Sequence, residues 1–270
     1  MVKKFTIHFE DFERVIESTA AFIKNEIMDV LNSRPDIFTE KYQKMFSIDI
    51  LPSALMFTED ELLTRPMKTA EGKTAGWKDK AFSKEEIAKI YNSDKGDRHS
   101  TPAKAHMRWK NNDGILEISD MYIAINYDIL KISVLRHLYD IIRYQDIVLR
   151  SWARHEAGHI LDYIMLFDGK PVSVIKKDDK ICNKAKKELN EFKKSVGYDT
   201  NKKALTREVD RQLEEMYFNM PQEARADTLG GVDRKKVIDY CFEYADKDMK
   251  VIATIKSKIV KREKKTADPS

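Results

Sequence analysis

Two histidines four residues apart, inside a stretch of helical periodicity, constrain this fold more than any other feature of the chain. His155 and His159 lie within a helix predicted for residues 147–167, and Asp168 and Gly169 directly after it, with Pro171 just beyond, predict its end. Side chains at positions i and i+4 project from the same face of a helix, with about 5–6 Å between their β-carbons, so both imidazoles can bind one metal ion. The fold must therefore place another element against this face.

The residues between the two histidines support the same interpretation. Glu156 follows the first histidine, where its carboxylate could take a proton from a metal-bound water without being a ligand itself. Gly158 costs a helix interior about 1 kcal/mol relative to alanine, which makes sense if another backbone must approach there. The alternative interpretation is a coincidental pair of surface histidines.

A third protein ligand must come from elsewhere in the chain, because a catalytic zinc site has three protein ligands and one open position. The third histidine of the metzincin pattern is absent, since Met165 stands in its place. The best candidate is Glu223, on a helix predicted for residues 220–229, where Asp227 lies one turn later and could accept the second N–H of a ligating histidine. Small residues at 224 and 226 would let the two helices pack closely. The alternatives to Glu223 are Asp162, Glu214 and Glu215.

The two motifs together, H-E-A-G-H at 155–159 and E-A-R-A-D at 223–227, resemble the gluzincin branch of the zincin metallopeptidases, which use H-E-x-x-H with a downstream E-x-x-x-D. The resemblance covers two short helices. It implies one Zn²⁺ per chain held by His155, His159 and Glu223, with Glu156 as catalytic base and acid and Asp227 as the partner of a ligating histidine. The implied function is hydrolysis of peptide bonds in a protein or peptide substrate, through a zinc-bound water activated by Glu156. The alternative is a non-catalytic zincin-like protein with a binding or structural role.

Apolar periodicity predicts a mainly α-helical chain with a small β-sheet, an α+β fold. Residues 1–112 are expected to form an N-terminal helical region, with a helix over 11–31, and a polar connector broken by glycine and proline. Residues 113–270 are expected to form a zincin-like metallopeptidase domain that begins with a strand or hairpin over 114–127. Further helices are expected over 83–91, 130–144, 147–167, 179–196, 203–218, 220–229 and 233–261, followed by a basic tail.

Composition and charge weigh against several other classes of protein. The chain has 49 basic and 45 acidic residues, and much of the excess lies in the tail at 256–265, so nucleic acid is not expected as a partner. The sequence contains neither a signal peptide nor an apolar window long enough for a membrane helix, so we expect a cytoplasmic protein without a membrane partner. Cys182 and Cys241 lie far apart, which indicates neither a disulfide framework nor a thiolate metal site.

The resemblance also predicts where a substrate would bind. In zincins the strand before the active helix borders the cleft, which would make residues 121–127 the edge that pairs with an extended peptide. Hydrolysis also needs a hydrogen-bond donor for the developing oxyanion. The sequence leaves the choice open among Tyr163, Tyr217, His106, Arg154 and Arg225.

Overall fold

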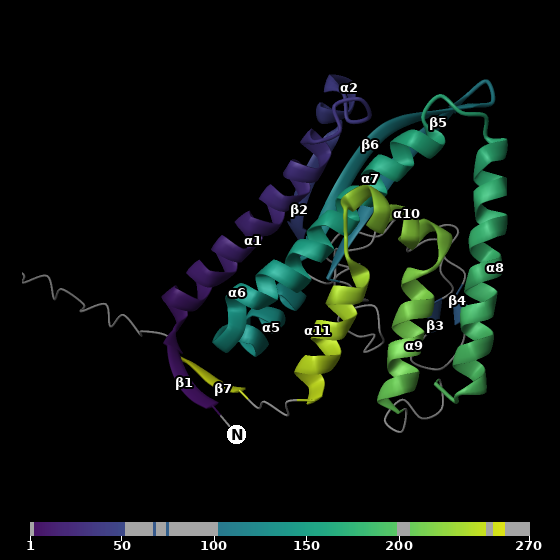
Figure 1. The fold of residues 1–270 in the computed structure, drawn as a ribbon. Helices are drawn as coiled ribbons and strands as arrows, with labels where there is room; N and C mark the ends of the chain where they lie inside the picture. Colours follow the sequence, from purple (N-terminus) through teal and green to yellow (C-terminus); the bar gives the residue numbers. More distant parts are fainter. Residues whose placement is uncertain are drawn as a thin grey trace, which may run out of the picture.

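The computed structural model describes residues 3–51, 67–68, 74–75, 102–198, 206–246 and 251–256. Over these residues the chain is mainly helical with a small mixed sheet, which is the α+β class that the sequence predicts (Figure 1). The helix expected over 83–91 lies outside the described residues. A short separate ladder joins β3 (Met67–Lys68) and β4 (Thr74–Ala75).

The sheet has the order β2-β6-β5, with β6 in the centre. The strand β6 (Ile115–Asn126) pairs in parallel with β2 (Phe46–Leu51) and antiparallel with β5 (Ala103–Asn112). Asp113 and Gly114, both with positive φ, form the tight turn between β5 and β6. The strand expected over 114–127 is therefore confirmed, and it is β6.

The strand β5 shows that the polar connector predicted up to residue 112 was wrong at its end. The buried part of β5 is made mostly of small side chains, including Ala103 and Ala105, whereas the strand is exposed from residue 108 onward. Residues 103–110 do alternate apolar and polar side chains, but Met107 and Trp109 are the large apolar ones, so the hydrophobic signal is weak. The main-chain ladder with β6 forms the strand instead.

The long N-terminal helix α1 (Phe9–Asn32) packs along α7 (Arg150–Phe167), which also contacts the sheet. The helix expected over 11–31 is therefore confirmed. Apolar side chains of α1 such as Ile16 and Ile27 share one core with Ile123 of β6 and Ile160 of α7. The division of the chain at residue 112 stays a prediction, although this core contains residues from either side of it.

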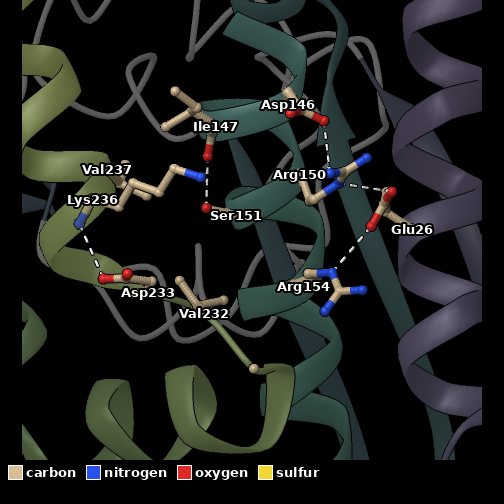
Figure 2. A pocket seen from close by; sticks show the side chains of 11 residues that line it. Glu26, Asp146, Ile147, Arg150, Ser151, Arg154, Val232, Asp233, Lys236 and Val237 are labelled. Carbon is tan, nitrogen blue, oxygen red and sulfur yellow. Dashed lines mark hydrogen bonds and ion pairs between the residues drawn. The ribbon is translucent and has the colours of Figure 1, made fainter. Parts of the chain in front are cut away.

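A buried carboxylate also ties α1 to α7. Glu26 of α1 accepts hydrogen bonds from Arg150 at 2.9 Å and from Arg154 at 3.0 Å, one on each carboxylate oxygen. Figure 2 shows these side chains beside a cavity of about 440 Å³ that is also lined by Asp146, Asp233 and Lys236. Three acidic and three basic side chains line this cavity, so their formal charges cancel.

The chain from β6 to the end of α7 is helical almost throughout. The helix α5 (Tyr127–His137) is capped by Asn126, whose side chain accepts the backbone N–H groups of Asp128 and Ile129. A 3₁₀ turn (Leu138–Asp140), α6 (Ile141–Tyr144) and a π-helical turn (Gln145–Leu149) then lead into α7. The helices predicted over 130–144 and 147–167 are confirmed in this continuous run.

The described part of the C-terminal half is mainly helical up to residue 246. The helices α8 (Ser173–Ser195), α9 (Arg207–Phe218) and α10 (Pro221–Gly230) correspond to those predicted over 179–196, 203–218 and 220–229. The prediction of one helix over 233–261 was wrong in its second half. The helix α11 (Arg234–Asp246) is followed by a strand, β7 (Val251–Lys256), which pairs in parallel with β1 (Lys3–His8). The β-branched residues of 251–255 favour a strand once β1 offers a partner.

Among the described residues, no helix has both the length and the apolar character to cross a membrane.

A partly buried histidine, His137, lies where α5, α6 and α11 meet. The ring of His137 stacks on that of Tyr144, with 3.7 Å between centroids, and Tyr244 lies against it at 4.6 Å. Burial, together with the positive charge of Arg136, lowers the pKa of His137 to about 4. The folded chain therefore keeps this imidazole neutral at pH values where an unfolded chain protonates it.

We predict that His137 makes the protein less stable in mild acid. An unfolded histidine takes up its proton near pH 6.5, whereas folded His137 does so only near pH 4. The free energy of unfolding should therefore fall as the pH is lowered between these values. Denaturant unfolding at pH 7, 5.5 and 4 should show a smaller decrease for His137→Phe, which keeps an aromatic ring. Equal decreases in both proteins would contradict this assignment.

Candidate metal centre

The helices α7 and α10 bring three potential ligands together. His155 Nε2 lies 3.1 Å from Glu223 Oε2 and 3.1 Å from His159 Nε2, and His159 Nε2 lies 3.4 Å from Glu223 Oε2. All three side chains are largely shielded from solvent, with exposed fractions of 8%, 12% and 6% for His155, His159 and Glu223. Two imidazole nitrogens and one carboxylate oxygen thus face a single point.

The spacing of these donor atoms fits a tetrahedral metal ion. With bonds of about 2.0–2.1 Å, the length that zinc makes to nitrogen, neighbouring donors in a tetrahedron lie about 3.3 Å apart. The three observed separations are 3.1, 3.1 and 3.4 Å. The donors therefore form one face of such a tetrahedron, which leaves a fourth corner for another ligand. This cluster could hold one metal ion.

A close crossing of the two helices makes this geometry possible. A β-carbon added to Gly158 of α7 would lie 2.0 Å from the carbonyl oxygen of Ala226 of α10. A β-carbon added to Gly230 of α10 would lie 2.2 Å from the carbonyl oxygen of Arg154 of α7. The two backbones therefore touch at two points, as the mid-helix glycine and the small residue at 226 led us to expect.

Asp227 orients the first histidine. Its Oδ1 lies 2.6 Å from His155 Nδ1, and the Asp227 side chain is one turn beyond Glu223 on α10. Burial alone would raise the pKa of Asp227, but the hydrogen bonds with His155 and Arg234 outweigh it and lower that pKa. An ionised Asp227 accepts the Nδ1–H of His155, which leaves the lone pair of Nε2 pointing at the other donors.

The site attracts positive charge strongly. Burial disfavours a charged imidazole, yet the hydrogen bonds with Asp227 and Glu223 raise the pKa of His155 to about 9. Burial likewise opposes the ionised form of Glu223, but its hydrogen bonds with His155 and His159 lower the pKa of Glu223 well below its ordinary value. Two ionised carboxylates therefore flank His155, and a metal cation could replace the proton between His155 and Glu223.

Glu156 lies apart from the three ligands and faces the sheet. Its Oε2 accepts the backbone N–H of Ala105 on β5 at 2.6 Å.

The edge of the sheet beside the site is not the one predicted. Because β6 is paired on both sides, residues 121–127 cannot be the free edge, and that prediction was wrong. The edge strand next to α7 is β5, a strand that the sequence analysis did not predict.

The alternatives to Glu223 as third ligand are placed elsewhere. Asp162 accepts the Nε–H of Arg225 at 2.9 and 3.1 Å, and Arg225 also pairs with Asp178 of α8 at 3.0 Å. Glu215 pairs with Arg211 within α9 at 3.1 Å. Among the residues that the structure describes, Glu214 and Glu215 do not belong to the metal-binding cluster.

The candidate donors for an oxyanion are also separated by the structure. Arg154 pairs with Glu26, and Arg225 pairs with Asp162. The ring of His106 stacks on that of Tyr122, with 4.5 Å between centroids. The other two candidates are tyrosines. The ring of Tyr163 lies 5.9 Å from that of His159, and burial with the negative charges of Glu223 and Glu156 raises the pKa of Tyr217.

Sequence reasoning missed one charged residue of this centre. Arg234, the first residue of α11, donates to both oxygens of Asp227 at 2.6 and 2.9 Å. It also missed Phe218 at the end of α9, whose ring packs edge-on against His155 with 5.8 Å between centroids. Neither residue belongs to a spacing motif, and only the folding of α9 and α11 around α10 reveals them.

Comparisons with protein-family models, with curated proteins and with solved structures found no match. The chemistry that this centre could support is therefore inferred from its own geometry. That geometry is a triangle of donor atoms, an oriented histidine and a carboxylate at an edge strand.

We predict that Gly158→Ala disrupts the crossing of α7 and α10. The new β-carbon would meet the Ala226 carbonyl oxygen at 2.0 Å, so the helices must separate. The expected cost is about 1–3 kcal/mol in the free energy of unfolding, although alanine favours a helix by up to about 1 kcal/mol. The amount of bound metal should also fall, because Glu223 would move away from the two histidines.

Gly231→Ala is the matched control. Gly231 has a φ of 65°, so alanine there is strained, but its β-carbon would meet Arg154 Nη1 at an ordinary 3.6 Å. This variant should lose stability and keep its metal. Both variants are compared with the parent by denaturant unfolding and metal analysis. If Gly158→Ala were as stable as the parent and bound as much metal, the close contact of α7 and α10 would not be needed.

Proposed function

We propose that this protein is a zinc-dependent peptidase of the zincin type, similar to the gluzincins. The observation that carries this proposal is the triangle of His155 Nε2, His159 Nε2 and Glu223 Oε2, with sides of 3.1–3.4 Å. A fourth side chain, Glu156, directly follows His155 and is not one of these donors. The substrate class is a protein or peptide.

Zinc is the metal that best suits these donors. Two histidines and one glutamate are a ligand set that catalytic zinc sites use, and Asp227 would fix the tautomer of His155. When bound, zinc would supply a Lewis acid that polarises the scissile carbonyl group and lowers the pKa of water. One Zn²⁺ per chain is expected.

Glu156 would perform the proton transfers. It directly follows His155 on α7, its carboxylate is not part of the donor triangle, and its negative charge acts on His155. A carboxylate in this position can accept a proton from the attacking water and pass it to the departing amine. The N–H of Ala105 at 2.6 Å holds one oxygen of Glu156 in place.

The outer edge of β5 would bind the substrate. Ala105 lies opposite Ile123 in the ladder, yet its N–H bonds to Glu156, so this N–H points away from β6. By the alternation of a strand, the main-chain groups of residues 103 and 107 point the same way. An extended peptide could pair with these groups and would place its scissile bond near Glu156 and the metal.

One observation favours a second candidate, a non-catalytic zincin-like protein. The bond between Glu156 and Ala105 links α7 to the sheet, which is a structural role for the proposed base. In that case the metal would stabilise the crossing of α7 and α10, and β5 would bind a partner without cleaving it.

Metal analysis provides the first test. After dialysis against metal-free buffer, the protein should retain close to one zinc per chain, and Glu223→Ala should lose most of it. The matched control is Glu214→Ala, which removes a carboxylate from α9, outside the described cluster, and should keep its zinc. Zinc-free parent protein, or loss of zinc in the control alone, would contradict the proposed ligands.

Glu156→Gln separates the two candidate functions. The glutamine keeps the size of the side chain but cannot accept a proton, so hydrolysis should fall by about 10²–10⁴-fold while zinc content stays unchanged. Cleavage is measured by mass spectrometry on a mixture of unstructured peptides. The control is Glu215→Gln on the exposed face of α9. Equal cleavage by parent and Glu156→Gln would rule out this base, and no cleavage by the parent would favour the non-catalytic candidate.

A further inference from the structure

The side chain of Arg234 makes four contacts at the back of the metal centre. Its Nη2 donates to Asp227 Oδ1 at 2.6 Å and its Nε donates to Asp227 Oδ2 at 2.9 Å. The same Nη2 lies 3.1 Å from His155 Nδ1, and the guanidinium stacks on the ring of Phe218 at 3.6 Å. With 13% of its side chain exposed, Arg234 belongs to the interior rather than to the surface.

The hydrogen-bond chemistry of these groups fixes one arrangement. Asp227 Oδ1 lies 2.6 Å from both His155 Nδ1 and Arg234 Nη2, so two donors share this oxygen. A guanidinium has donors only, so it cannot accept the Nδ1–H of His155. Asp227 is therefore the acceptor for that proton, and Arg234 holds the carboxylate in the plane and position that the imidazole needs.

We propose that Arg234 is a positioning residue, which acts through Asp227 to keep the Nε2 lone pair of His155 directed at the metal. This inference rests on the proposed zinc site. Arg234 joins three helices to the ligand, because Phe218 comes from α9, Asp227 from α10 and Arg234 itself from α11. Arg234 does not touch the metal position itself, but through Asp227 it sets the orientation of the ligand His155.

The fork of the arginine is essential to this role. Its two donors reach both oxygens of Asp227 and prevent the carboxylate from rotating, while the flat face rests on Phe218. A lysine would keep the positive charge but could bond to only one oxygen at a time in this geometry. The Arg234→Lys substitution therefore separates the effect of the positive charge from the effect of the two-point contact that orients Asp227.

The experiment measures zinc affinity by competition with a chelator of known affinity. Arg234→Ala should bind zinc about 10–100-fold more weakly than the parent, and Arg234→Lys should be intermediate, because loss of a partner behind a ligating histidine has effects of this size. Circular dichroism of the metal-free proteins identifies a variant that does not fold. If Arg234→Ala does not fold, the Arg234→Lys result decides, since unchanged zinc affinity there would overturn the role of the fork.

A double mutant distinguishes positioning from a general structural role. In an Asp227→Ala background, Arg234→Ala should change zinc affinity by less than about twofold, because its route to His155 is gone. An equal loss of affinity in both backgrounds, or no loss in the parent background, would overturn the inference. Those outcomes leave the three ligands and the proposed peptidase intact. A parent protein that binds no zinc would instead overturn both proposals.

Discussion

The contact between the backbones of α7 and α10 is the constraint on which the rest of the site depends. Gly158 and Gly230 each lack a β-carbon where the other helix presents a carbonyl oxygen, so the helices touch at two points along their crossing. Only at this distance can a short glutamate side chain from α10 lie 3.1–3.4 Å from two histidines on α7. Gly158 lies inside α7, where glycine disfavours the helix alone, whereas Gly230 is the last residue of α10.

Around this crossing, each buried carboxylate has a cationic or metal-binding partner. Asp227 faces Arg234, Asp162 faces Arg225, and Glu26 faces Arg150 and Arg154. Glu223 differs, because its neighbours are the two histidines and the amide of Gln222. A buried carboxylate without a fixed cation is costly, so the arrangement calls for a proton or a metal ion between Glu223 and the histidines. Folding of this region and binding of a cation are therefore coupled.

The sequence predicted which residues of the site share one helix face, but it predicted few of the contacts between different helices and strands. Helical periodicity placed His155 and His159 on one face of α7, and the spacing of Glu223 and Asp227 placed both on one face of α10. The strand β5 has few large apolar residues, and β7 pairs with β1, which is far from it in the sequence. Arg234 lies on a different helix from each group that it contacts, so no spacing rule could connect them. Residues that meet through tertiary packing are visible only once the chain is folded.

The long chain segment between the two motifs does not weaken their geometry. It folds as α8 and α9, which run beside each other away from the end of α7 and back to the start of α10 (Figure 1). This pair has its own small core around Leu189, Leu213 and Met220. The last residues of the segment reach the site, since Phe218 packs against His155 and supports Arg234, so the segment forms a wall of the centre as well as a connection.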